Sequence, residues 1–172
     1  MASVHVAAEL NDVKALARLL DADPGQAETA QYKWPGARPL HIACEEGSVE
    51  AALLLIDRGA VIDIQNLEGL TPLMLACRAG EARVVAMLLA RGADPTLRCP
   101  TRTTALMYAS CYDYRERRSD RVAVIRRLLE DGRVPIDAVD EDGRTALWYA
   151  CDDGSAERAG VLLIEGMADH TI

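Results

Sequence analysis

Residues 72–77 read Pro-Leu-Met-Leu-Ala-Cys, and the same pattern of apolar and small residues returns along the chain. Residues 39–44, Pro-Leu-His-Ile-Ala-Cys, precede this stretch by 33 positions, and residues 105–110, Ala-Leu-Met-Tyr-Ala-Ser, follow it by 33. Another copy, residues 146–151, comes 41 positions later, and a weaker one, residues 4–8, lies 36 positions before its counterpart in the 39–44 copy. Self-similarity at a nearly fixed period is typical of repeat proteins, so five repeated units are predicted.

Each copy continues with a turn and a second apolar segment. The turn positions hold residues that accept a left-handed backbone at low steric cost, namely Asn11, Gly47, Gly80, Asp113 and Gly154. Paired aliphatic residues such as Leu88-Leu89 mark the second segment, and a glycine such as Gly92 ends it. Each unit is therefore predicted to be helix, tight turn and helix, and the units are predicted to stack because one short helix pair cannot bury its apolar face alone.

The stretch Gly69-Leu70-Thr71-Pro72-Leu73, with Ala76-Cys77, Gly80 and Gly92-Ala93-Asp94 after it, resembles the ankyrin repeat signature. The resemblance covers essentially the whole chain. It implies an all-α fold, an ankyrin-type solenoid of about five helix-turn-helix repeats with short β-hairpin loops between them. We expect one ankyrin repeat domain over residues 1–172, with repeats at about 2–33, 34–66, 67–99, 100–140 and 141–172 and an insertion within 112–120.

Two positions depart from the signature. Arg38 stands where three later units have a threonine that can cap a helix N-terminus, so the second unit is predicted to lack this cap. Arg102 replaces the hairpin glycine seen at Gly36, Gly69 and Gly143, so an altered turn is expected there.

Composition and charge narrow the function. The 172 residues carry 19 Lys plus Arg and 27 Asp plus Glu, a net charge of −8, which argues against nucleic-acid binding and favours a partner with a basic surface. The longest apolar run, residues 84–90, is too short to span a membrane.

The five cysteines occur without Cys-x-x-Cys pairs, so free thiols in a reducing compartment, the cytoplasm or the nucleus, are expected. Cys44, Cys77 and Cys151 share one small position of the repeat, which is predicted to be buried. The spacing of His41 and Cys44 also fits a metal half-site, but packing within the repeat is the stronger interpretation.

No catalytic residue, metal site or cofactor site is predicted. The sequence contains no nucleophile elbow, phosphate-binding glycine loop or HExxH pair, and its histidines at 5 and 41 follow the repeat register. The acidic run at residues 137–142 lacks the spacing of a calcium loop and is predicted to be a solvated hairpin tip. We therefore expect that the chain is not an enzyme.

Residues that the repeat leaves free are the candidates for partner binding. Those at the hairpin tips are Trp34, Leu67, Glu68, Leu70, Glu141, Asp142 and Arg144. The resemblance places the ends of the first helices on a concave face, with Arg78, Tyr112 and Asp152 as candidates. The insertion adds Tyr114 and Arg117, residue types that are favoured at interfaces.

We expect Trp34, Leu67 and Leu70 to anchor a partner while acidic residues attract its basic groups. Two alternatives stay open: Trp34 covers the first interface between repeats, and the insertion is a solvated protrusion.

The resulting prediction is a protein-protein interaction module, a scaffold or adaptor, that binds a partner through its hairpin tips and concave face. The alternative is a regulatory or substrate-recruiting ankyrin segment of a larger multidomain enzyme or complex. The expected partner is another protein rather than nucleic acid or a membrane, and the chain itself is expected to be a monomer.

Overall fold

The computed structural model describes residues 3–29, 36–111 and 120–166. These ranges contain the α-helices α1 (Val4–Glu9), α2 (Val13–Ala22), α3 (Pro39–Glu45), α4 (Val49–Asp57), α5 (Pro72–Ala79), α6 (Ala82–Ala90), α7 (Ala105–Ser110), α8 (Arg121–Asp131), α9 (Ala146–Asp152) and α10 (Ala156–Ile164), and the 3-10 helix η1 (Pro24–Glu28). An isolated antiparallel bridge joins Arg98 and Thr104 in one of the loops between helix pairs. The prediction of an all-α solenoid of paired helices is confirmed.

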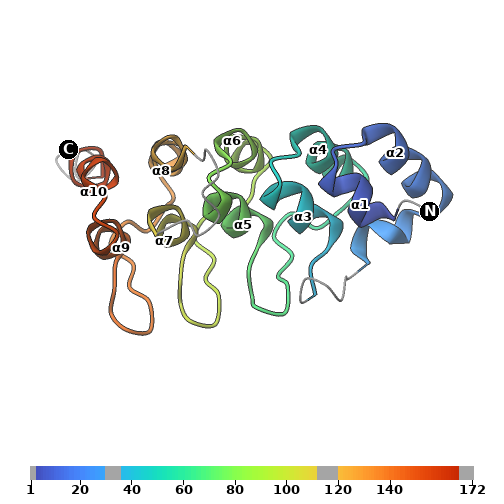
Figure 1. Ribbon diagram of the computed structural model, residues 1–172. Coiled ribbons are helices and arrows are strands. Elements are labelled where there is room, and N and C mark those ends of the chain that lie inside the picture. The colour runs from blue at the N-terminus through green and yellow to red at the C-terminus, as the bar shows by residue number, and fades with distance from the viewer. Residues whose placement is uncertain (1–2, 30–35, 112–119, 167–172) are drawn as a thin grey trace.

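The helices form two stacked layers (Figure 1). The first helices of the pairs, α1, α3, α5, α7 and α9, pack against one another in chain order, and each second helix lies beside its own first helix. The loops that lead from one pair to the next extend beyond the first-helix layer on the side away from the second helices.

The core is continuous from pair to pair because each repeat supplies the same buried positions. Ala43, Ala76, Ala109 and Ala150 have no exposed surface, so the first helices approach closely. Leu55, Leu88 and Leu128, at equivalent positions of the second helices, are equally buried. This burial of the recurring residues accounts for the stacking.

Cys151 corrects one expectation about the cysteines. Cys44 and Cys77 are fully buried, and burial raises the pKa of both thiols above the ordinary value. Cys151 occupies the same repeat position but is exposed, because no helix pair among the described residues packs on the side of α9 away from α7. All five cysteines are free thiols.

Arg38 makes no capping hydrogen bond with its side chain, as predicted. By contrast, Thr71 Oγ1 accepts a hydrogen bond from Met74 N and so caps α5. The beginning of α3 is held by His41, whose Nδ1 accepts the N–H of Arg38 at 3.0 Å and whose Nε2–H donates to the carbonyl of Leu70 at 3.0 Å. The histidine thus links two repeats in its neutral form.

This arrangement makes stability depend on pH. Burial lowers the pKa of His41 from 6.5 to about 4, so the folded protein resists protonation while the unfolded chain accepts the proton. The contribution of His41 is fully present above pH 6.5 and is lost as the pH falls toward about 4. From these pKa values we expect the free energy of unfolding to drop by about 2 kcal/mol between pH 7 and pH 5.

Urea unfolding at the two pH values measures this loss. His41→Met, which introduces the residue found at Met74 and Met107, is the matched variant without a titrating group. It should be less stable at pH 7 but lose about 2 kcal/mol less than the parent between pH 7 and pH 5. Equal losses in both proteins would contradict the role of His41.

The turn at Arg102 is not altered, contrary to expectation. Its φ is 61°, in the same left-handed region as Gly36 at 67°, Gly69 at 72° and Gly143 at 78°. Its N–H donates to the carbonyl of Cys99 at 2.8 Å, as Gly69 N–H donates to the carbonyl of Asn66 at 3.0 Å. The third hairpin therefore keeps the common turn with a non-glycine residue in a conformation that disfavours a side chain.

Arg102→Gly should relieve this strain and raise the free energy of unfolding by about 1 kcal/mol. Arg98→Gly, in the same hairpin but without a positive φ, is the control and should destabilise the protein. Urea titrations of both variants test the expectation, which fails if Arg102→Gly is no more stable than the parent.

Candidate partner-binding surface

The hairpin tips are stacked against one another. Leu67 covers Gly36, where an added Cβ would lie 2.6 Å from Leu67 Cγ, and Pro100 covers Gly69 so closely that an added Cβ would collide with its ring. The next tip is joined by a hydrogen bond of 3.1 Å from Glu141 N to the carbonyl of Thr101. We call six of the exposed residues at these tips the hairpin-tip row: Leu67, Glu68, Pro100, Thr101, Glu141 and Asp142.

Side chains inside each loop hold its tip in shape. Asn66 Oδ1 accepts the N–H groups of Glu68 at 3.0 Å and Leu70 at 2.9 Å. In the third hairpin, where Cys99 stands at this position, Thr101 Oγ1 contacts Cys99 Sγ at 3.0 Å. The tips are therefore fixed by local hydrogen bonds rather than by a β-sheet.

Asp140 has the same role in the last hairpin, which corrects the prediction that the whole acidic run is solvated. Its Oδ1 accepts from Asp142 N and Arg144 N, and its Oδ2 accepts from the Tyr149 hydroxyl at 2.6 Å. Burial raises the pKa of this carboxyl, but the three hydrogen bonds outweigh burial and lower the pKa overall. The other acids of the run, Asp137, Glu141 and Asp142, are exposed, as predicted.

Leu67 and Leu70, both expected as exposed anchors, lie in opposite environments. Leu67 is 81% exposed and lies beside the exposed Glu68. Leu70 is 3% exposed, because the chain turns inward after Gly69, and its carbonyl binds His41. Leu70 is thus a core residue rather than a partner anchor.

Arg144 is held within its own repeat. Its guanidinium lies 3.1 Å from Asp142 Oδ2 and 4.7 Å from the centre of the Trp148 ring, an ion pair combined with a cation-π contact. Arg144 therefore holds the last tip together. The sequence predicted it to be available for a partner, but its charge is already engaged by Asp142 and Trp148.

Two candidates at the ends of first helices are placed differently. Arg78 is half-buried and pairs with the buried Glu45 of the preceding repeat, with 2.9 Å between Nη2 and Oε1. Asp152, at the end of α9, is exposed. Trp34, Tyr112, Tyr114 and Arg117 lie outside the described residues.

Two buried arginines escaped the sequence analysis. Arg121 donates to the carbonyls of Tyr108 at 3.0 Å and Cys111 at 2.7 Å, and it also donates to the carbonyl of Arg78. Arg158 donates to the same Cys111 carbonyl at 3.0 Å and forms an ion pair with Asp153. The two guanidinium groups thus bind carbonyls at the C-terminal ends of α5 and α7, where the last carbonyls of a helix have no hydrogen-bond partner within the helix.

A signal for Arg158 existed in the repeat pattern. It stands four positions before the buried Leu162, where α4, α6 and α8 have Ala51, Val84 and Val124. Burial, and after it the charge of Arg121, lowers the pKa of Arg158 from the usual arginine value.

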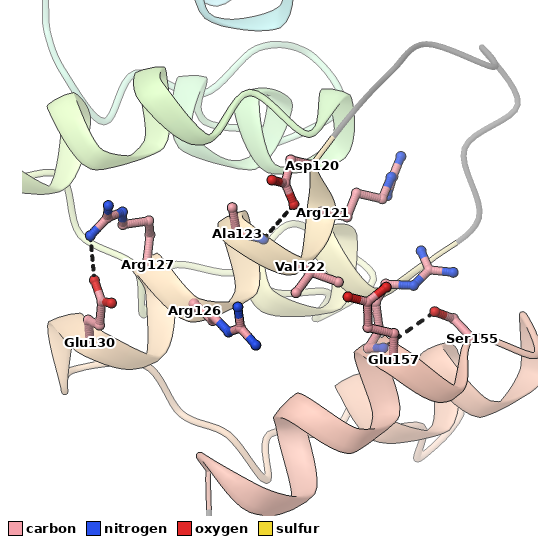
Figure 2. Close-up of a pocket in the computed structure, with 10 residues that line it drawn as sticks. Asp120, Arg121, Val122, Ala123, Arg126, Arg127, Glu130, Ser155 and Glu157 are labelled. Carbon is pink, nitrogen blue, oxygen red and sulfur yellow. Dashed lines mark hydrogen bonds and ion pairs between the residues drawn. The ribbon is translucent and has the colours of Figure 1, made fainter.

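A cavity of about 590 Å³ opens between α8 and α10 beside these arginines (Figure 2). Its lining includes Arg126 and Arg127, which are paired with Glu165 and Glu130. Four arginines and three acidic residues line it together, so it does not select a ligand of one charge.

The described part of the chain contains no group of three His, Cys, Asp or Glu side chains placed to hold a metal ion. No helix in these ranges is long and apolar enough to cross a membrane.

A family model described as ankyrin repeats, in 3 copies, matches residues 4–99 and 63–117. A search of curated proteins returned no match.

Proposed function

Since the chain belongs to the ankyrin repeat family, we propose that it is a scaffold or adaptor that binds another protein through its hairpin tips and concave face. Ankyrin repeats are commonly protein-protein interaction modules. The observation that carries the proposal is the stacked hairpin-tip row, which offers an exposed apolar side chain on a fixed base.

Leu67 supports this role because a large apolar side chain that is 81% exposed gains contact area when a partner covers it. The acids of the hairpin-tip row are Glu68, next to Leu67 in the chain, and Glu141 and Asp142 two hairpins further along, and all three are exposed. An apolar anchor with charged surroundings suits a partner that supplies an apolar pocket and basic side chains around it.

The stacked tips also favour binding through their limited freedom. Contact with Gly36 and the hydrogen bonds of Asn66 fix the loop that carries Leu67. A loop that is already ordered loses little conformational entropy on association, which leaves more of the interaction energy as affinity.

Affinity purification with mass spectrometry tests the proposal. Leu67→Arg should remove the specific partners or weaken them by at least about tenfold, because it replaces a candidate hot spot with a charge. Val61→Arg is the matched control, since Val61 is also exposed at 53% but lies outside the hairpin-tip row.

Circular dichroism should show that both variants remain folded. Identical partner sets for the parent, Leu67→Arg and Val61→Arg would contradict the proposed role of the row.

A further inference from the structure

The third hairpin tip carries an exposed arginine where the neighbouring tips have glycine. Arg102 has a φ of 61°, a left-handed conformation that disfavours any side chain, whereas Gly69 and Gly143 adopt it freely. At Gly69 an added Cβ would also collide with the next tip, yet the third tip holds a whole arginine side chain at this position. Strain of this kind is concentrated at functional sites, so the side chain needs an explanation.

Asn11 shows how such strain is offset inside the chain. It also has a positive φ, of 53°, but its Oδ1 accepts the N–H of Ala51 at 2.9 Å and its Nδ2 donates to Glu50 Oε2 at 2.7 Å. Within residues 3–29, 36–111 and 120–166, the guanidinium of Arg102 has no hydrogen bond or ion pair. Its strain is therefore not offset by these residues, and its donors are available to another molecule.

The exposed charges change sign from tip to tip. Glu68 is exposed on the tip before Arg102, and Glu141 is exposed on the tip after it. Neither acid has an ion pair with the other described residues, whereas Asp142 is paired with Arg144. A partner that covers all three tips therefore meets a negative, a positive and again a negative group.

The stacking of the repeats sets the spacing of these charges. The tips form a single row (Figure 1), and packed neighbouring helices lie about 8 to 10 Å apart. An extended chain advances about 3.3 Å per residue, so about every third residue of an extended segment along the row meets a tip.

We propose that Arg102 is a specificity determinant that binds a carboxylate in an extended segment of another protein, with a lysine or arginine about three residues to either side of that carboxylate. The inference rests on the proposed binding of a partner by the hairpin tips. A guanidinium holds a carboxylate through two parallel hydrogen bonds, while Glu68 and Glu141 attract the flanking basic groups. Leu67, next to Glu68, offers an apolar contact at one end of the segment.

Fluorescence anisotropy at low ionic strength with two labelled peptides tests the proposal. The first peptide, Leu-Lys-Ser-Ser-Glu-Ser-Ser-Lys, has the proposed order of charges, and the second has lysine in place of the glutamate. Attraction by the net charge of −8 alone favours the second peptide. We expect the first peptide to bind at least about threefold more tightly, because Arg102 attracts its glutamate and repels the lysine.

Variants of Arg102 show whether this residue causes the preference. Arg102→Gly should abolish it without unfolding the protein, because glycine is favoured at this φ. Arg102→Lys should keep part of it, since the charge remains but the two parallel hydrogen bonds are lost. Arg83→Gln removes the same charge from an exposed arginine of α6 and should leave the preference unchanged.

The proposal is overturned if the lysine peptide binds the parent as tightly as the glutamate peptide, if neither peptide binds, or if Arg102→Gly keeps the preference. Capture of partners from the cell is a separate readout. Partners that are lost from Leu67→Arg but fully kept by Arg102→Gly would leave the proposed function standing and remove only the role of Arg102.

Discussion

Replacing Arg121 by methionine should lower the free energy of unfolding by about 4 kcal/mol, because its guanidinium serves three main-chain carbonyls in a buried place. A hydrogen bond to a charged donor contributes about 1.5 to 3 kcal/mol, and loss of the donor leaves its acceptors without that partner. Arg121 joins the end of α5, through Arg78, to the end of α7, through Tyr108 and Cys111. Methionine keeps the length and apolar stem of the side chain, so the variant tests the hydrogen bonds rather than packing.

The measurement is urea unfolding of Arg121→Met beside Arg127→Met. Arg127 belongs to the same helix but is exposed and pairs with Glu130 three positions on, an interaction of about 0.5 kcal/mol or less. A loss below about 1 kcal/mol in Arg121→Met would show that solvent or neighbouring groups replace the guanidinium.

The repeat pattern predicted the features that recur in every unit and missed the contacts that occur in only one unit. Equal spacing of Leu55, Leu88 and Leu128 was enough to predict stacked helix pairs, because each copy meets the same neighbours and must bury the same positions. Arg121 lies just after the insertion that lengthens the fourth repeat, and its carbonyl partners come from the ends of two different first helices, Arg78 of α5 and Tyr108 and Cys111 at the end of α7. No periodic pattern brings those carbonyls together.

The candidate surface was predictable in part for the same reason. The glycines located the hairpin tips in the sequence. They did not show where each side chain points, because the turn at Gly69 leaves Leu67 exposed and Leu70 buried. Asn66 and Asp140 occupy equivalent positions, and each has a side-chain oxygen, Oδ1, that accepts backbone N–H groups of its own loop. This role could have been predicted by aligning the repeats. The exposure of Cys151 was not predictable from the repeat, because the same position is fully buried in Cys44 and Cys77.

Gly69→Ala should cost about 3 kcal/mol in two separable parts. A side chain at φ 72° is disfavoured by about 1 kcal/mol, since only glycine adopts this left-handed conformation freely. The added methyl group would also collide with Pro100, whose ring is closed on its own backbone and cannot rotate away, an overpacking cost of about 2 kcal/mol. The second part measures how tightly neighbouring tips are stacked.

Gly92→Ala separates the two parts, because Gly92 has a φ of 89° but no atom within 4 Å of an added Cβ. It should cost only about 1 kcal/mol. In the double variant Gly69→Ala with Pro100→Ala the ring is gone, so Gly69→Ala added to Pro100→Ala should cost no more than Gly92→Ala alone. Equal losses in Gly69→Ala and Gly92→Ala would show that the tips are free to move apart, and the hairpin-tip row would then lack the fixed base on which its proposed binding of a partner depends.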